Sequence, residues 1–149
     1  MKQFEVVETP LEPTAYHKFV LNEKQGAICT FTGHVREWTK GTQTIYLEYE
    51  AYIPMAEKML AQIGDEISER WPGVLTSIGH RIGKLDISDI AVVIATSSPH
   101  RADSYRANEY AVERLKEIVP IWKKEIWSDG EEWIGDSRHY HSSVKENES

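Results

Sequence analysis

The sequence predicts an α+β fold, in which a mixed, mainly antiparallel sheet packs with two long helices in a single domain. Much of the chain consists of segments in which apolar and polar residues alternate, as in half-buried strands. Two longer segments instead repeat apolar residues every three or four positions, the period of an amphipathic helix. The chain has 149 residues, the usual length of one domain. We expect residues 1–136 to form this domain and residues 137–149 to be a polar, mobile tail.

The composition restricts the classes of function. The net charge of −7 argues against nucleic acid as a partner, because binding it needs a broad basic surface. The sequence has no run of about 18 apolar residues, so it predicts no membrane span, and its first residues lack the pattern of a signal peptide. We therefore expect a cytoplasmic protein. Cys29 is the only cysteine, which excludes an internal disulfide and gives a poor basis for a zinc site.

The first predicted strand covers residues 27–36, with apolar residues on one side and polar residues on the other. The polar side carries His34 and Arg36, which lie about 7 Å apart by strand rise. They form either part of a site or part of a solvated sheet face. After a loop at residues 37–42, the alternation resumes at residues 45–51, which predicts a hairpin-like pair of strands.

The middle of the chain predicts a helix followed by two strands. Residues 54–71 have the helical period, and Pro72 and Gly73 end the helix. Residues 74–82 alternate as a strand does. The continuous apolar run at residues 90–95 is typical of a strand that is covered on both faces, so we expect it at the centre of the sheet.

Ser98 and Pro99 predict the start of a second long helix, as an N-cap followed by a proline at the first helical position. Pro120 ends this helix. The residues expected to share its buried face are Tyr105, Val112, Leu115 and Val119. His100 and Arg101 follow the N-cap, where free backbone N–H groups and the helix dipole favour an anion. They either bind a phosphate or carboxylate there or merely cover the helix end.

Residues 121–127 and 132–134 flank a turn at residues 128–130 and predict a short hairpin. Lys123 lies in this hairpin, and Lys116 lies near the end of the helix before it. A lysine enclosed by apolar groups loses proton affinity and becomes a usable base or nucleophile. The alternative is structural, because lysines are common at helix C-termini and on sheet edges.

Four other residues have simpler interpretations. His80 shares a strand face with apolar neighbours and is expected in the core, and Cys29 is expected to be a packed thiol. His139 and His141 offer two metal ligands, but their surroundings provide no fixed third one. We therefore predict no metal site.

Residues 26–36 resemble the Gly-Ala-x-x-x-Phe-x-Gly-x-x-Arg segment of molybdopterin synthase large subunits. Further matches to this family follow in the same order, at residues 47–52 with Met55, 80–85, 98–101 and 115–125. Together they extend over residues 26–134, so the sequence is identified as a member of this family. The resemblance implies an α/β hammerhead-like domain.

The resemblance also implies an activity and partners. Members of the family are sulfurtransferases that convert cyclic pyranopterin monophosphate to molybdopterin by forming its dithiolene. The sulfur comes from the C-terminal Gly-Gly thiocarboxylate of a small ubiquitin-like subunit, so no cofactor or metal is needed. Two large subunits form a homodimer within a heterotetramer. The rival interpretation is a non-catalytic adaptor that binds a ubiquitin-like tail, and the intact Lys116 and Lys123 pair argues against it.

By resemblance, Lys116 and Lys123 are the catalytic residues. The substrate-contacting positions implied by the family are His34, Val35, Arg36, His100, Arg101, Lys116, Lys123, Lys124 and Glu125. Arg138 is a further basic candidate. Since Arg101 and Lys116 lie at opposite ends of one helix, about 22 Å apart by helical rise, we expect two copies of the chain to build each site.

Overall fold

The computed structural model describes residues 1–128 and 130–134. Its elements are β1 (Phe4–Val7), the 3₁₀ helix η1 (Pro13–Phe19), β2 (Ala27–His34), β3 (Trp38–Thr39), β4 (Thr42–Ala51), α1 (Ile53–Arg70), β5 (Leu75–Arg81), β6 (Gly83–Asp86), β7 (Ile90–Ser98), α2 (Arg101–Ile118), β8 (Ile121–Trp127) and β9 (Gly130–Ile134). The predicted tail at residues 137–149, with Arg138, His139 and His141, lies outside the described residues.

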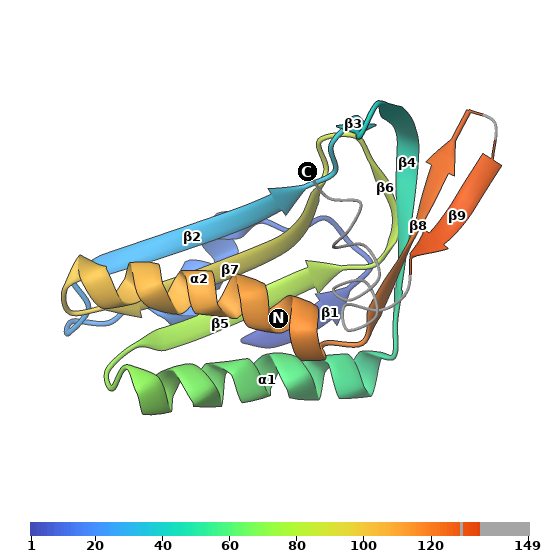
Figure 1. Ribbon diagram of the computed structural model, residues 1–149. Helices are drawn as coiled ribbons and strands as arrows, with labels where there is room; N and C mark the ends of the chain where they lie inside the picture. The colour runs from blue at the N-terminus through green and yellow to red at the C-terminus, as the bar shows by residue number, and fades with distance from the viewer. Residues whose placement is uncertain (129, 135–149) are drawn as a thin grey trace.

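The strands form two sheets instead of the single sheet expected. One has the order β1-β5-β7-β2, and the other has the order β3-β4-β8-β9, with β6 also paired to β4. Among the described strands, β1 and β5 are the only parallel pair. The prediction of a mixed, mainly antiparallel α+β fold is therefore confirmed. Figure 1 shows how β4, β8 and β9 stand at one end of the four-stranded sheet.

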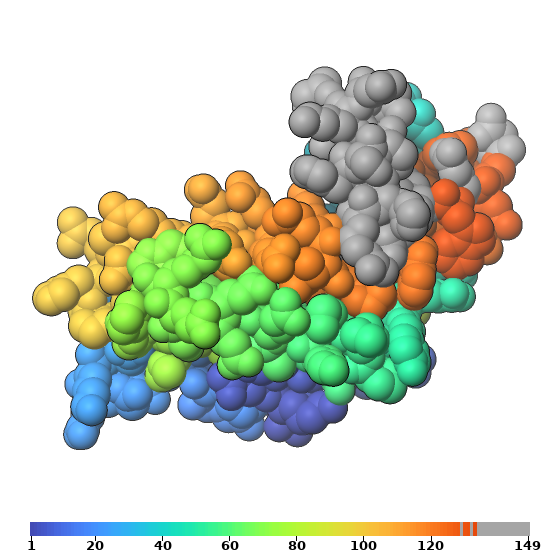
Figure 2. Space-filling view, turned by 60° about the horizontal axis from the view of Figure 1, so that its bottom comes forward, coloured from blue at the N-terminus to red at the C-terminus, as the bar shows by residue number. Residues whose placement is uncertain are grey.

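Both long helices cover one face of the four-stranded sheet (Figure 1). They lie side by side, and the N-terminal segment lies next to α1 (Figure 2). The apolar period predicted for α1 is confirmed, because its buried residues include Leu60, Ile63 and Ile67. In the part of the chain that the structure describes, neither helix has the length and apolar content to cross a membrane.

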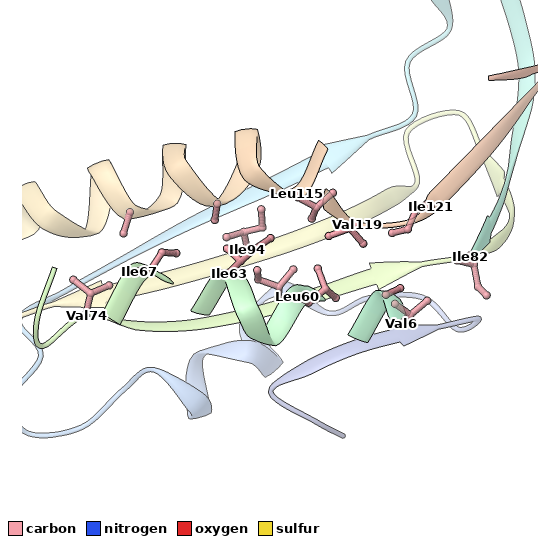
Figure 3. Packing of buried hydrophobic residues seen from close by; sticks show 14 residues of the cluster. Val6, Leu60, Ile63, Ile67, Val74, Ile82, Ile94, Leu115, Val119 and Ile121 are labelled. Atoms are coloured by element: carbon pink, nitrogen blue, oxygen red, sulfur yellow. The ribbon is translucent and has the colours of Figure 1, made fainter. Parts of the chain in front are cut away.

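The main core lies between the two helices and the sheet (Figure 3). Ile94 of β7 points toward the helices, whereas its neighbours Val93 and Ala95 pack on the other face against Tyr16 and Val20 at η1. The central position of the 90–95 run, covered on both faces, is confirmed. β7 also supplies one wall of the cavity described below.

The predicted hairpin between residues 27–36 and 45–51 is wrong. β2 pairs with β7, and β4 pairs with β8 and β6, so the two strands belong to different sheets. An alternating pattern shows that a strand has a buried and a polar face, but it does not identify the neighbouring strand. The strand also ends earlier than predicted, at His34, after a register shift between Gly33 and His34.

Tyr105 is the second departure from the sequence prediction. Its side chain is exposed, and the buried face of α2 instead consists of Ser104, Ala107, Asn108, Ala111 and Leu115. The polar members of this face make hydrogen bonds to the sheet. Asn108 donates to the backbone oxygens of Cys29 and Ile94, each at 3.1 Å. Small and hydrogen-bonded residues bring α2 close to β2 and β7, which apolar periodicity alone cannot reveal.

An ion network joins the two helices at the surface. The Arg114 guanidinium of α2 binds both carboxylate oxygens of Glu66 on α1, at 2.8 and 3.1 Å, and the Tyr110 hydroxyl donates to the same carboxylate at 2.6 Å. The bidentate bond from Arg114 lowers the pKa of Glu66 to about 2. This network links α1 to α2 at the surface, in addition to their apolar packing in the core.

Candidate active site

A cavity of about 290 Å³ lies where the end of α2 meets both sheets. Six elements contribute to its wall. The lining residues are Phe31, Gly33, His34, Tyr49, His80, Ala91, Val92, Ile94, Val112, Leu115, Lys116, Ile121 and Lys123. Most of these side chains are apolar, so charged groups at this site are surrounded by a medium of lower polarity than water.

The cavity brings together the two lysines for which the sequence suggested chemistry. Lys116 comes from the last turn of α2, where the helix dipole stabilises a cation, and it is exposed. Lys123 comes from β8, opposite Tyr49 of β4, and it is partly buried. Two cations that line one small cavity attract an anionic group and can exchange protons with it.

His34 lines the same cavity, and both of its ring nitrogens have partners. Nδ1 lies 2.8 Å from the backbone oxygen of Ser88, and Nε2 lies 2.9 Å from the Thr32 hydroxyl. A carbonyl oxygen only accepts, so Nδ1 donates to Ser88, and Nε2 shares a hydrogen bond with the Thr32 hydroxyl, which can donate or accept. These bonds hold the ring in place as part of the wall.

Tyr49 and His80 belong to the cavity but were not among the predicted site residues. Their rings meet edge to face, with centroids 5.1 Å apart and an interplanar angle of 70°. Burial, followed by the charge of Glu125, raises the pKa of Tyr49 to about 12, and burial lowers the pKa of His80 to about 4. The core position predicted for His80 is confirmed. Both residues lie within the segments that resemble the family, and this resemblance was the only sequence feature that could have pointed to them as site residues.

The second group of predicted residues lies in a separate pocket. His100 and Arg101 line a surface pocket of about 690 Å³ at the start of α2, together with Gly26, Ala27, Ile28 and Tyr105. The two pockets have no lining residue in common. The 15 residues from Arg101 to Lys116 correspond to a rise of about 22 Å along α2.

The predicted helix start at Ser98 is wrong by two residues. Ser98 is the last residue of β7, and α2 begins at Arg101 after His100, whose backbone is extended. The Ser98 hydroxyl still accepts a hydrogen bond from a helical N–H, that of Ser104, at 3.1 Å. The serine therefore satisfies an N–H group of the first turn from outside the helix.

Gly26 allows the chain to pass close to this helix start. Its N–H donates to the backbone oxygen of Ser98 at 3.0 Å, and a Cβ atom at this position would collide with the carbonyl oxygen of Pro99. Only glycine permits this approach. The first glycine of the family segment thus has a packing role at the edge of the pocket that contains Arg101.

Val35 and Arg36 follow β2 beyond the cavity wall. The Val35 side chain is buried with Leu47 and Leu85, and its backbone N–H and oxygen bond to the turn at Asp89 and Ser88. Val35 is therefore anchored in the core. Arg36 is exposed and lies two residues beyond His34, with its side chain outside the lining of the 290 Å³ cavity.

Lys124 and Glu125 follow Lys123 along β8. Lys124 forms ion pairs with Glu131 at 3.4 Å and Glu48 at 3.9 Å, and it lies over the ring of Trp133. Strand alternation directs it to the opposite side from Lys123. Glu125 shares the side of Lys123 and is close enough to Tyr49 to raise the pKa of its phenol.

No group of three His, Cys, Asp or Glu side chains is placed to hold a metal ion in residues 1–128 and 130–134. Cys29 is partly buried, and burial raises the pKa of its thiol. The titratable side chains that line the cavity are two lysines, two histidines and a tyrosine. Such groups bind anions, donate and accept hydrogen bonds, and transfer protons.

Fold and site together define an α+β domain with basic side chains in pockets at both ends of one helix, an arrangement suited to an anionic ligand. Comparison with known families is more specific. Residues 6–118 match the model of the MoaE protein family. The chain belongs to this family.

Relatives with assigned names agree with this placement. The molybdopterin synthase catalytic subunit of Staphylococcus aureus strain COL is 68% identical over 148 residues, which covers 99% of this chain and 100% of that protein. The corresponding subunit of Staphylococcus carnosus is 67% identical and covers 98% of this chain and 97% of that protein.

Solved structures show the same fold. The crystal structure of molybdopterin synthase from S. aureus has a TM-score of 0.89 and 72% identity, covering 91% of this chain and 98% of that chain. Molybdopterin cofactor biosynthesis protein E from Burkholderia multivorans has a TM-score of 0.78 and 36% identity, covering 93% of this chain and 92% of that chain. A chain in a complex of subunits 1 and 2 of molybdopterin-converting factor from Helicobacter pylori has a TM-score of 0.71 at 19% identity, covering 85% of this chain and 86% of that chain.

Proposed function

We propose that this chain is the catalytic subunit of a molybdopterin synthase. As a sulfurtransferase it converts cyclic pyranopterin monophosphate to molybdopterin, with sulfur from the C-terminal thiocarboxylate of a small ubiquitin-like subunit. The observation that carries this proposal is the meeting of Lys116 and Lys123 in one mainly apolar cavity. The close relationship to molybdopterin synthase catalytic subunits over nearly the whole chain gives independent support.

The two lysines suit the chemistry of this reaction. Thiocarboxylate and phosphate are anions, and both are attracted to ammonium groups in a site of low polarity. As sulfur adds to the pterin, protons move and the cyclic phosphate opens, steps in which Lys116 and Lys123 act as proton donors and acceptors. A lysine amine is also able to take the acyl group left on the partner's glycine. The sulfur arrives already activated, so the proposed reaction needs no metal or redox cofactor.

The sulfur donor in this proposal is a separate protein. A structural relative from H. pylori was solved as a complex of two subunits, which supports a partner of this kind. Each product contains two sulfurs, so two charged partner molecules are consumed and the intermediate is retained between deliveries. Strong binding of the phosphate by cationic residues provides that retention.

We further propose that each site combines two copies of the chain. A cavity of 290 Å³ is at the lower end of the range for small-molecule sites, so it suits part of the substrate. His100 and Arg101 suit the anionic remainder, but they line a pocket at the far end of α2. A two-fold dimer places the helix start of one copy beside the helix end of the other.

The open edge of β2 offers a route to this dimer. Within the described residues β2 pairs only with β7, so its other edge presents unpaired backbone groups. An antiparallel pairing of two β2 edges about an axis near Thr30 and Phe31 sets Ala27 of one copy opposite His34 of the other. Ala27 lines the pocket of Arg101, and His34 lines the lysine cavity. Such a pairing joins the two pockets.

The test of the function is dithiolene formation by the purified protein with cyclic pyranopterin monophosphate and a thiocarboxylated partner subunit. We expect molybdopterin to form, and no product when the partner ends in an ordinary carboxylate. The rival function is a non-catalytic adaptor that binds a ubiquitin-like tail. Binding of the partner without any turnover would favour the adaptor and contradict the proposal.

A further inference from the structure

The His80 ring lines the lysine cavity, yet the proposed chemistry of Lys116 and Lys123 does not use it. His80 belongs to β5 in the interior of the four-stranded sheet, and only 5% of its surface is exposed. The wall around it includes Val92 and Ile94, whose side chains offer no hydrogen bonds. A buried polar ring reduces stability unless it makes hydrogen bonds. The partners of the two ring nitrogens therefore show which part of His80 serves the fold and which part remains for a ligand.

The hydrogen bond at Nδ1 defines which nitrogen of the ring is protonated. Nδ1 of His80 lies 2.9 Å from the backbone oxygen of Arg81, and since that oxygen only accepts, Nδ1 carries the proton. The pKa of about 4 keeps the ring neutral near pH 7. Nε2 is therefore an unprotonated acceptor. The hydrogen bonds found among the described residues leave it available to a ligand.

Tyr49 holds this acceptor in a fixed orientation. The edge-to-face contact between its ring and the imidazole restrains rotation of both. With a pKa of about 12, the Tyr49 phenol keeps its proton near pH 7 and remains a donor. The cavity thus combines a neutral acceptor and a neutral donor with the cations Lys116 and Lys123. This combination suits a ligand that is uncharged at one end and anionic at the other.

We propose that His80 recognises the substrate, with Nε2 accepting a hydrogen bond from an N–H group of the pterin ring. This inference rests on the proposed function and names the part of the substrate that the cavity holds, the nitrogen heterocycle. A phosphate oxygen is itself an acceptor and gains nothing from an unprotonated nitrogen. The phosphate therefore lies toward the cationic residues, and the heterocycle lies against His80 and Tyr49.

Two variants separate recognition from packing. In His80→Gln the longer side chain brings its carbonyl oxygen near the place of Nε2. In His80→Asn the amide reaches only the place of Nδ1, from which it can still donate to Arg81. We expect His80→Asn to bind cyclic pyranopterin monophosphate about tenfold more weakly than the wild type, as for one lost hydrogen bond, and His80→Gln to stay within about threefold. Affinity for the partner subunit should be unchanged in both variants.

A measurement on the wild-type protein avoids any effect of substitution on folding. In protein with ¹⁵N-labelled histidine, the His80 Nε2 resonance should have the position of an unprotonated nitrogen and move upfield when cyclic pyranopterin monophosphate is added. Pterin binding with an unmoved Nε2 resonance would overturn this inference alone. Equal weakening by both variants, or full affinity in His80→Asn, would do the same. A wild type that neither binds pterin nor forms dithiolene would overturn the proposed function as well.

Discussion

Lys116 and Lys123 reach the cavity from elements of different rigidity. Lys116 is exposed on the last turn of a helix, whereas Lys123 is held in a strand that pairs with β4 on one side and β9 on the other. The strand lysine is therefore the better oriented of the two, and the helix lysine has more freedom to move with the reacting groups. Both positions tolerate loss of the amine without a large cavity in the core.

We predict that Lys116→Ala and Lys123→Ala each reduce dithiolene formation at least about a hundredfold, the usual effect of removing a group that transfers protons. Single-turnover assays with thiocarboxylated partner would measure this, and circular dichroism would verify the fold. Lys58→Ala, an exposed lysine on α1, is the matched control and should retain full activity. Near-normal turnover in both cavity variants would refute the catalytic assignment.

Arg101 has a different predicted role, because its pocket lies away from the lysines. We expect Arg101→Ala to weaken binding of cyclic pyranopterin monophosphate about tenfold or more, through loss of a charge-assisted hydrogen bond to phosphate. Affinity for the partner subunit should hardly change. Arg106→Ala serves as the control, since Arg106 is also on α2 but pairs with Asp103. An equal loss of both affinities would contradict this division of roles.

Sequence reasoning drew attention to the charged residues of the cavity more readily than to the neutral ones. Local pattern left Lys116 and Lys123 open between a functional and a structural role, and the resemblance to the family named them as catalytic candidates. Tyr49 and His80 were not named as site residues, because each fits an ordinary half-buried strand position. Their membership in the cavity depends on strands β4 and β5, which belong to different sheets. A contact of this kind is set by tertiary packing, which no local pattern contains.

Periodicity predicted the individual elements better than their neighbours. The period of α1 and the two-sided burial of β7 follow directly from their apolar residues, and both were confirmed. The expected pairing of residues 27–36 with 45–51 failed, because strands near in sequence were assumed to be near in space. β1 and η1 were not predicted. β1 has only four residues, too few for its alternation to stand out. It pairs with β5, which is distant in sequence.

The ion network between α1 and α2 should make the stability of the fold depend on pH. The folded pKa of Glu66 is about 2, below its ordinary value of 4.5, so the unfolded chain takes up a proton first on acidification. The stabilisation is therefore complete above about pH 4.5 and is lost as the pH falls toward 2. Glu66→Gln should lower the free energy of unfolding by about 2 kcal/mol at pH 7 and flatten its dependence on pH in that window.

Urea denaturation of the wild type and of Glu66→Gln, repeated at several pH values between 3 and 7, measures this contribution. The control is Glu69→Gln, an exposed carboxylate on the same helix, which should behave as the wild type. If Glu66→Gln is as stable as the wild type at every pH, the network contributes nothing to folding.

The separation of the two pockets predicts complementation between defective copies. Mixing Arg101→Ala with Lys116→Ala under conditions of subunit exchange should restore activity. In a mixed dimer with shared sites, one site carries both defects and the other is fully wild type. Random exchange makes half of the dimers mixed, so the activity regained should approach about a quarter of the wild-type value.

The assay needs a pterin concentration at which each variant alone shows little turnover, and exchange should be verified by mass spectrometry. The matched control is the double variant, Arg101→Ala with Lys116→Ala, mixed with wild type. With shared sites, each site of its mixed dimers carries one defect, so no site in these dimers is fully wild type. Verified exchange without recovery of activity would mean that each site is assembled within one chain.

The wall of the lysine cavity also fixes when the site can exist during synthesis. Its residues extend from Phe31 to Lys123, and the last contribution comes from β8, which must pair with β4 made some 75 residues earlier. A nascent chain on the ribosome therefore has no complete cavity until almost the whole domain has emerged. Substrate cannot guide the early stages of folding. It can only bind the finished fold and, by mass action, protect that fold from later unfolding.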